Sequence, residues 1–417
     1  MKKAVVTGIG CVTPFGIGIE KFTDGLRNGK SGIRKLAKFE ADELINCLVV
    51  GDVPDFNHEE YIEHRLDKKR LSPVVPMTWL SVEEAMRMAG IEAGALSADE
   101  LRGIDVMIGT AGGGIEFGEQ QYEYYFTGRV AEANPYAIPS GIVGMLPSEV
   151  SIKYGFRGLS HAFSNGCTSS TDAIGYALDR IRNGRSSTII TGGADACITR
   201  GLMAGYCFMR AMPTSFNDCP EKASRPFNKD REGFVLSEGA WMMVLEEEEH
   251  ARQRGVKPIA EIAGYGSTCD AYHRVKIKGD AVESARAVEL AMEDAGVAKE
   301  EIENVNLHGT STPLNDKLET LAMKLVFGDR AYDIPMSATK SMLGHPQGAS
   351  GAMGLLATLG GMQEGFVHPT INYENPDPDC DLNYVPNDAI ERDITTAVCN
   401  CIGFGSKNSA LVVKRSA

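Results

Sequence analysis

The chain has 417 residues, of which 43% are hydrophobic and 24% are charged. This composition excludes a disordered protein and predicts a soluble globular protein, large enough for two domains or two fused halves. With 42 basic against 56 acidic residues, the formal net charge of −14 argues against a nucleic-acid binder and leaves no basic amphipathic helix for a membrane surface.

Short apolar runs typical of β-strands alternate with helical patterns along the chain. In the first part, the runs AVVTGIG, DVMIGT, STIITGGAD and WMMVLEEE accompany helices expected near 76 to 90 and 169 to 182. In the second part, PIAEIAGYG, VNLHGT, IPMSATK, AVCNCIGFG and SALVVKR accompany helices expected near 281 to 294, 315 to 326 and 350 to 362. This alternation predicts an α/β protein with largely buried sheets.

The second part of the chain repeats the architecture of the first. We therefore predict two related halves that meet near residues 250 to 257, and we assign residues 1–253 and 254–417 to them. The repeat lies in the order of elements, without convincing identity between individual residues. Three long segments, 31 to 60, 115 to 145 and 206 to 232, look irregular and are expected to form a cap or a subunit interface.

The N-terminus and the longest uncharged run bear on membrane targeting and cofactor binding. Two lysines precede an apolar stretch that is short, broken by glycine and without a cleavage site, so this stretch predicts a first strand. The run from 345 to 362 is shorter than the roughly twenty residues of a spanning helix. We expect a cytoplasmic protein without a membrane partner. The loop TGIGCVTPFG lacks the third glycine of a dinucleotide site, which argues against nicotinamide binding.

Cys167 is the first candidate for chemistry, because it precedes the helix expected at 169 to 182. Unpaired N–H groups at a helix start stabilise a thiolate, which makes Cys167 a candidate nucleophile. The alternative is a free cysteine that serves as a small buried hydrophobe. Two downstream histidine motifs, around His308 and His345, favour the catalytic interpretation. The ten cysteines contain no C-x-x-C pair, and the long separations disfavour a metal site built from Cys167 and both histidines.

Four motifs together resemble those of the β-ketoacyl-[acyl carrier protein] synthases. The five residues that carry these motifs lie in four segments: Cys167 in SNGCTSS, His308 in HGTSTPLNDKLE, Lys340 and His345 in TKSMLGHPQGASG, and Phe404 in GFGSKNS. The similarity continues through SRPFNKDREGFVLSEGA and DPDCDLNYVPNDA. Within the family, the chain resembles both the elongating synthase II type and the ketosynthase subunits of type II polyketide systems. The resemblance implies a thiolase fold, in which two βαβαβ-type halves stack in five layers, and it implies a dimer.

The resemblance also implies an acyltransferase reaction. Cys167 would hold an acyl group as a thioester, and His308 and His345 would stabilise, through their Nε2 donors, the enolate left when malonyl-carrier loses carbon dioxide. Attack of the enolate on the acyl-cysteine would extend the chain by two carbons. Lys340 and Glu319 match an ion pair that positions the histidines, and the alternative for this pair is a purely structural salt bridge.

Further positions acquire expected roles from the same resemblance. The backbone N–H groups of Cys167 and Phe404 match an oxyanion hole, and Phe404, between two glycines, matches a mobile gate. Thr310 and Thr312 match threonines that line the tunnel for phosphopantetheine. The substrates are expected on the phosphopantetheine arm of acyl carrier protein, with no cofactor bound to the enzyme itself.

Several residues depart from the common family pattern and leave the substrate open. A glycine precedes the cysteine in Ser164-Asn165-Gly166, Pro346-Gln347 follows His345, and Ser406-Lys407 follows the gate. Gly112 falls where a bulkier residue closes the acyl pocket in some members, so a longer or stiffer chain is expected to fit. Tyr206 falls at another position that lines the pocket and adds a phenol, which suits a more polar acyl chain.

The expected partners follow from the carrier. Acyl carrier proteins are acidic, so docking requires basic residues despite the net charge. The candidates are Lys68, Lys69, Arg70, Arg129 and Arg210. The assembly is either a homodimer or a heterodimer with a chain-length-factor homologue. A non-catalytic partner subunit is disfavoured because Cys167 is present. A thiolase-like or cysteine hydrolase activity is disfavoured because a pair of histidines marks the decarboxylating branch of the family. Fatty acid elongation and polyketide or polyene extension both remain open.

Overall fold

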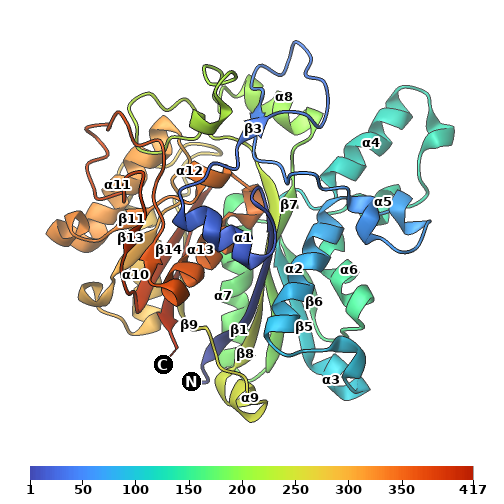
Figure 1. The fold of residues 1–417 in the computed structure, drawn as a ribbon, viewed down its shortest axis with the longest axis horizontal. Helices are drawn as coiled ribbons and strands as arrows, with labels where there is room; N and C mark the ends of the chain where they lie inside the picture. The colour runs from blue at the N-terminus through green and yellow to red at the C-terminus, as the bar shows by residue number, and fades with distance from the viewer. Residues whose placement is uncertain (417) are drawn as a thin grey trace.

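A computed structural model describes residues 1–416 and contains two half-sheets with the same internal order (Figure 1). The strands of the first half-sheet are β1 (Ala4–Thr13), β5 (Ile104–Gly109), β6 (Ser160–Phe163), β7 (Thr188–Ala196) and β8 (Glu238–Glu247). Those of the second are β9 (Ala260–Cys269), β10 (Asn304–Asn306), β11 (Met336–Ser337), β14 (Thr396–Gly403) and β15 (Lys407–Arg415).

The half-sheets are topological copies of one another. The spatial orders are β6-β5-β7-β8-β1 and β11-β10-β14-β15-β9, which is third, second, fourth, fifth, first in each half. The strand directions also agree between the two half-sheets. Strands β5 and β10 each pair in parallel with both neighbours, whereas β8 and β15 each pair antiparallel with both neighbours. This order supports two related halves, while the boundary at residue 253 stays a prediction.

The two half-sheets meet along one short edge. Residues 4–6 of β1 pair antiparallel with residues 260–262 of β9, so the strands form a continuous path instead of two separate sheets. Because this pairing covers only three residues, the half-sheets can diverge beyond it and enclose helices between them.

Helices complete five layers around the two half-sheets. The helices that cover the sheets are α2 (Val74–Met88), α6 (Met145–Tyr154), α7 (Ser169–Arg182), α10 (Val282–Ala295), α11 (Pro313–Phe327) and α13 (Ser350–Glu364). Helix α2 packs on β1 and β8, and α10 packs on β9 and β15. Helices α7 and α13 contact one another and strands of both halves, which places them in the middle layer. The predicted helices are all present, displaced by no more than two residues at either end.

Glycines at matching places let an outer helix approach each half-sheet closely. A Cβ at Gly8 of β1 would lie 2.0 Å from the Ala85 carbonyl oxygen of α2, and a Cβ at Gly264 of β9 would lie 2.2 Å from the Ala291 oxygen of α10. The glycines of the opening TGIG therefore serve backbone packing between strand and helix, and the absence of a dinucleotide site stays a prediction.

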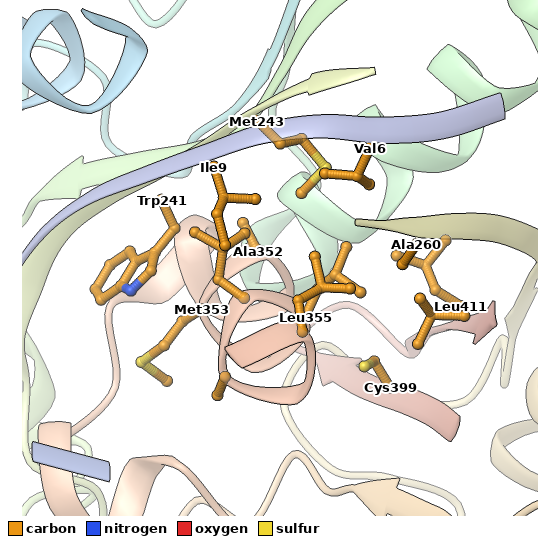
Figure 2. Close-up of a cluster of buried hydrophobic side chains, with 14 of the residues drawn as sticks. Val6, Ile9, Trp241, Met243, Ala260, Ala352, Met353, Leu355, Cys399 and Leu411 are labelled. Carbon is orange, nitrogen blue, oxygen red and sulfur yellow. The ribbon is translucent and has the colours of Figure 1, made fainter. Parts of the chain in front are cut away.

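One hydrophobic core spans both halves (Figure 2). Val6 and Trp241 come from the first half-sheet, Leu411 comes from the second, and Met353 of α13 lies between them. All four side chains are fully buried. Helix α13 is apolar and glycine-rich in sequence. This composition fits its position, because protein covers nearly its whole surface. The halves therefore form a single packed unit.

The segment from 115 to 145 was expected to be irregular, and the structure corrects this. It contains α4 (Ile115–Phe126) and the short helix α5 (Ala137–Gly141), which project from the body at one side (Figure 1). The helical pattern is hidden in the sequence because apolar residues of α4 face outward, with Phe126 81% exposed. The segments at 31 to 60 and 206 to 232 do contain little regular structure.

The remaining elements connect these layers. They are β2 (Gly16–Ile17), α1 (Ile19–Arg27), β3 (Arg34–Lys35), β4 (Val49–Val50), η1 (His58–Tyr61), η2 (Asp67–Lys69), η3 (Ala93–Ala95), α3 (Ala98–Gly103), η4 (Val130–Glu132), η5 (Gly166–Thr168), α8 (Arg200–Phe208), η6 (Pro220–Lys222), α9 (Glu248–Gln253), η7 (Lys299–Glu301), η8 (Gly328–Tyr332), α12 (Lys340–Leu343), η9 (Gln347–Ala349), β12 (Phe366–Val367) and β13 (Ile390–Glu391). Within residues 1–416, no helix is both long enough and apolar enough to cross a bilayer.

Candidate active site

Cys167 lies in the turn η5, immediately before α7, at the centre of the molecule. Gly166 adopts a φ of +72°, which turns the chain from the preceding strand into the helix. The Ser169 hydroxyl accepts from the Asn165 N–H at 2.8 Å and donates to the Gly166 carbonyl at 2.6 Å, which fixes this turn. Cys167 Sγ is buried and lies 3.2 Å from His345 Nε2.

His345 presents an Nε2–H group to the thiol. The Gln347 backbone N–H donates to His345 Nδ1 at 3.1 Å, so Nδ1 is the acceptor and the hydrogen of the neutral ring sits on Nε2. The ring is neutral because burial, followed by the charge of Lys340, holds the pKa of His345 well below its usual range.

His308 repeats this arrangement from the second half-sheet, just beyond the end of β10. Lys340 Nζ donates to His308 Nδ1 at 3.2 Å and to the His308 carbonyl at 2.8 Å, so Nε2 again carries the hydrogen. Burial, then Lys340, then His345 hold the pKa of His308 well below its usual range. The two imidazole rings lie 5.4 Å apart and perpendicular, at 88°. The site therefore contains two neutral N–H donors beside one thiol.

Lys340 and Glu319 do not form the direct ion pair that the sequence suggested. Their charged atoms are not within 4.0 Å, and Lys340 instead contacts His308. Glu319 accepts from the His308 N–H at 2.6 Å, the Gly309 N–H at 2.8 Å and Asn400 Nδ2 at 2.7 Å. The two residues therefore hold opposite sides of His308, Lys340 at the ring and Glu319 at the backbone. Burial lowers the pKa of Lys340.

The thiol of Cys167 is protonated at neutral pH, contrary to the thiolate expected at a helix start. Burial raises its pKa to about 11. The Lys340 charge and backbone hydrogen bonds of Phe404 and of Cys167 itself lower the pKa, but they do not offset burial. The same two backbone groups were expected to form the oxyanion hole, and this role stays a prediction.

Phe404 lies in the turn between β14 and β15, at the edge of the site, with 38% of its surface exposed. Gly405 has a φ of +86° and Ser406 a φ of +64°. The Ser406 hydroxyl donates to the His273 carbonyl at 2.8 Å and accepts from the His273 N–H at 3.1 Å. Ser406, which departs from the common family pattern, thus links the loop around Phe404 to the segment that follows β9.

A cavity of about 270 Å³ joins these groups. Cys167, His308, His345 and Phe404 line it, together with Thr310 and Thr312, whose hydroxyl oxygens lie 2.8 Å apart. Much of the remaining wall is apolar and comes from Met209, Phe234, Val275, Ile277, Leu314 and Ile402. One cavity therefore contains the thiol, both histidines and the two threonines predicted to line a tunnel.

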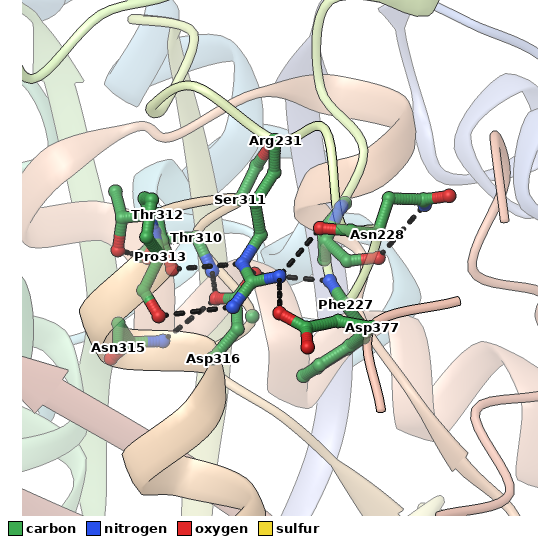
Figure 3. Close-up of polar contacts among 12 residues, drawn as sticks. Phe227, Asn228, Arg231, Thr310, Ser311, Thr312, Pro313, Asn315, Asp316 and Asp377 are labelled. Carbon is green, nitrogen blue, oxygen red and sulfur yellow. Dashed lines mark hydrogen bonds and ion pairs between the residues drawn. The ribbon is translucent and has the colours of Figure 1, made fainter. Parts of the chain in front are cut away.

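A buried arginine fixes the threonine segment (Figure 3). Arg231 donates to the Thr312 carbonyl at 3.2 Å and to the Pro313 carbonyl at 3.0 Å. It also pairs with Asp316 at 3.2 Å, and Asp316 accepts from the Thr310 N–H at 3.1 Å. Arg231 lies in the segment NKDREGF, and no pattern in the sequence indicates its role. The structure makes it the support of this wall.

Gly112 and Tyr206 do not line the cavity. A Cβ at Gly112 would lie 2.7 Å from Cys197 Sγ and 3.0 Å from Ile115 Cγ2, so the missing side chain leaves no open space within this chain. The expectation that Gly112 admits a longer acyl chain is therefore not met by the geometry of the single chain. Tyr206 reaches the cavity indirectly, because its hydroxyl donates to Gln347 Oε1 at 3.0 Å and Gln347 lines the wall.

The five basic candidates lie in two places. Arg210 lines the cavity that contains Cys167. Lys68 and Lys69 line a second cavity of about 680 Å³. Arg70 stacks on Tyr136 at 4.1 Å, and Arg129 pairs with Glu123 at 2.7 Å, so both are already engaged on the projecting arm. Their role in docking stays a prediction.

The thiol and both histidines are closer together than their sequence separations suggested. Their ligand atoms lie within 4.8 Å of one another, a geometry that suits a small metal ion as well as a catalytic triad. The ammonium of Lys340, 3.2 Å from His308 Nδ1, opposes a cation at this place. The absence of a metal stays a prediction.

Comparisons with known proteins agree over the whole chain. Residues 1–251 match the N-terminal domain and residues 259–374 the C-terminal domain of the family described as beta-ketoacyl synthase. The chain is 39% identical over 415 residues to a 3-oxoacyl-[acyl-carrier-protein] synthase 2 from Synechocystis sp., covering 99% of this chain and 98% of the relative.

Two solved structures share the fold at full coverage of both chains. One is the ishigamide ketosynthase/chain length factor, with a TM-score of 0.91 and 32% identity. The other is a type II PKS acyl-carrier protein in complex with its ketosynthase, with a TM-score of 0.88 and 30% identity. Matches to the family's two domains and a full-length relative near 40% identity leave one conclusion: this chain is a member of the β-ketoacyl synthase family.

Proposed function

We propose that the protein is a β-ketoacyl-[acyl carrier protein] synthase, which condenses an acyl group held on Cys167 with malonyl-carrier. One observation supports this above the others: two neutral histidines direct Nε2–H donors toward the place where a buried thiol would hold a thioester. Such donors suit an enolate, whose charge develops only in the reaction. A hydrolase would need instead a group that activates water.

Acyl transfer is the first step. The Cys167 sulfur attacks the carbonyl carbon of an acyl-carrier thioester, and the carrier thiol leaves with the proton that Cys167 loses. The backbone N–H groups of Cys167 and Phe404 stabilise the oxyanion of the tetrahedral intermediate. Because the resting thiol has a high pKa, Cys167 must lose its proton before or during this attack. The charge of Lys340 favours that deprotonation.

Decarboxylation and condensation follow in the same cavity. The bond between the malonyl α-carbon and its carboxylate breaks, carbon dioxide leaves, and the electron pair stays as an enolate hydrogen-bonded to Nε2 of His308 and His345. The enolate carbon then attacks the acyl carbonyl, the carbon–sulfur bond breaks, and Cys167 is regenerated. The product is a β-ketoacyl-carrier two carbons longer. Lys340 and Glu319 act as positioning residues, because they hold the His308 ring and backbone.

The carrier delivers both substrates. Thr310 and Thr312 present their hydroxyls to the cavity, where they suit the amides of a phosphopantetheine arm. Docking of an acidic carrier would use Arg210 at the cavity and Lys68 and Lys69 on η2. A neighbour of the same fold is described as a ketosynthase in complex with its acyl-carrier protein, which supports this partner.

A second subunit is part of the proposal. Apolar side chains of the arm formed by residues 115–145 are exposed, including Tyr125, Phe126, Ile138 and Ile142. They suit a homodimer, or alternatively a heterodimer in which a chain-length-factor homologue covers them, and a neighbour of the same fold is described as a ketosynthase/chain length factor. We further propose residues 1–253 and 254–417 as the two halves of each chain.

Intact-mass spectrometry tests the proposed function. Purified wild type and a Cys167→Ala variant are incubated with acyl-carrier, and wild type alone should gain the mass of the acyl group. Treatment of the wild type with EDTA beforehand should leave the adduct unchanged if the thiol and histidines serve catalysis instead of a metal. A folded wild type that gains no acyl mass, alone or mixed with a homologous partner subunit, would contradict the proposal.

A further inference from the structure

A polar pair, Tyr206 and Gln347, sits beside the catalytic groups. The Tyr206 hydroxyl donates to Gln347 Oε1 at 3.0 Å. Phe234 packs edge-on against Tyr206, with ring centroids 5.0 Å apart, and edge-on against His345, at 5.2 Å. This packing joins the pair to the histidine that contacts Cys167, and Gln347 lines the same cavity as Cys167.

The backbone around Gln347 fixes where its side chain points. Gln347 has a φ of +45°, a backbone conformation that residues other than glycine adopt only when their surroundings impose it. Its N–H is used by His345 Nδ1 at 3.1 Å, and its carbonyl accepts from the Ser350 hydroxyl at 2.7 Å. With Oε1 held by Tyr206, every polar atom of Gln347 except the amide nitrogen is engaged.

The amide nitrogen of Gln347 is buried and unpaired. Gln347 is only 6% exposed, and among the described residues its Nε2 has no hydrogen-bond partner. The residue lines the cavity that contains Cys167. A buried donor without an acceptor is costly, and the cost is removed when a ligand supplies an acceptor.

We propose that Gln347 Nε2 donates a hydrogen bond to an oxygen on the acyl chain carried by Cys167, which makes an oxygenated chain, keto or hydroxy, the preferred acyl donor. This inference rests on the proposed function and adds the substrate class to it. The amide nitrogen is a donor only, so it requires an acceptor atom, and a saturated chain would leave it unpaired. Sites built to bind a polar group reject analogues that lack it.

Competing acyl donors of equal length test the proposal. Hexanoyl, 3-hydroxyhexanoyl, 3-oxohexanoyl and 5-oxohexanoyl groups are loaded on the same carrier, and the rate constant for acylation of Cys167 is measured by intact mass. Wild type should favour at least one oxygenated chain over hexanoyl by about tenfold or more, in line with one hydrogen bond to a buried donor. The hydroxy and keto arms distinguish which oxygen is bound.

Variants separate this role from general packing. Gln347→Leu should bring the ratio of oxygenated to saturated rates toward one, and Tyr206→Phe should reduce it because the amide loses its anchor. The exposed Gln253→Leu, on α9, is the matched control and should keep the wild-type ratio. Gln347→Glu, which replaces the donor by an acceptor at nearly equal size, serves if the leucine variant melts at a lower temperature.

Two results would overturn the inference: equal rates for all four chains on wild type, or a preference that survives in both Gln347→Leu and Gln347→Glu. Absence of any acyl adduct with all four carriers is a different failure. It would remove the proposed function, and with it the inference built upon that function.

Discussion

Replacement of Arg231 by methionine should destabilise the fold and disorder the threonine wall of the active site. Arg231 is buried, and its partner Asp316 is fully buried, so removal of the guanidinium leaves an uncompensated carboxylate in the interior. The change also removes the donors to the Thr312 and Pro313 carbonyls. Breaking a buried ion pair in this way costs about 3–5 kcal/mol of the free energy of unfolding.

The loss of unfolding free energy caused by Arg231→Met should also depend on pH, and it should grow as pH rises. Burial raises the pKa of Asp316, and the Arg231 charge opposes that rise, so the variant raises it further. A carboxyl with a raised pKa in the folded state holds its proton after the unfolded chain has lost it. Because the unfolded chain contributes equally in both proteins, the deficit grows as pH rises above the folded-state pKa of Asp316 in the wild type, and it is complete above the higher folded-state pKa in the variant. The deficit should be larger at pH 7 than at pH 5.

Guanidinium denaturation at the two pH values measures this deficit. Arg252→Met is the matched control, because Arg252 pairs with Glu249 on the surface with 72% of its side chain exposed, and no measurable change is expected there. The double variant Arg231→Met with Asp316→Asn should recover part of the loss, since the fully buried carboxylate is removed, whereas Asp377, which pairs with Arg231 at 2.6 Å, still loses its partner. A loss equal to that of the Arg252 control, or one that grows as pH falls, would refute the reasoning.

Further predictions concern the thiol, its lysine, the gate and the packing of an outer helix. Alkylation of Cys167 by iodoacetamide should accelerate about tenfold per pH unit from pH 7 to pH 10, because only the thiolate reacts and its pKa is about 11; a plateau near neutral pH would contradict this. Lys340→Met should shift that profile to higher pH because a charge that lowers the pKa is lost, and an unchanged profile would exclude the effect. Ser406→Gly should speed amide hydrogen exchange at 272–274 and 404–406, since the hydroxyl ties these segments together; equal exchange would mean that the tie does not hold the gate. Gly266→Ala should lower unfolding free energy by about 1–3 kcal/mol, because its Cβ would lie 2.2 Å from the Ala287 oxygen, whereas Gly279→Ala, with nothing within 4 Å, should be neutral in the same denaturation assay.

Periodicity and motif order predicted much of the fold and the central site. The alternation of apolar runs with helical patterns located the buried strands and helices, because buried parallel strands and amphipathic helices leave distinct periods in a sequence. Helix α4 was missed because its apolar side chains face outward, toward a surface that a partner subunit would cover. Cys167, His308 and His345 could be selected together only because their motifs follow a family order.

The remaining features depend on packing that no local pattern encodes. The pKa of Cys167 is raised because the folded chain buries the sulfur, although its place before a helix suggested the opposite. Lys340 contacts His308 instead of Glu319 because α12 directs its side chain to the histidine ring. Gly112 adjoins Cys197, a residue distant in sequence, so the space beside it is already filled. The unpaired amide of Gln347 likewise follows from its contact with Tyr206.

The formation of a new carbon–carbon bond is the most direct test of the account. Wild type carrying an acyl group on Cys167 is mixed with malonyl-carrier labelled with ¹³C at the two carbons that the product would retain. We predict a β-ketoacyl-carrier two carbons longer that contains both labels, with loss of the acyl mass from the enzyme, and no such product from a His308→Ala, His345→Ala double variant that still becomes acylated. Labelled acetyl-carrier and free fatty acid as the only products of the wild type would contradict a condensing enzyme.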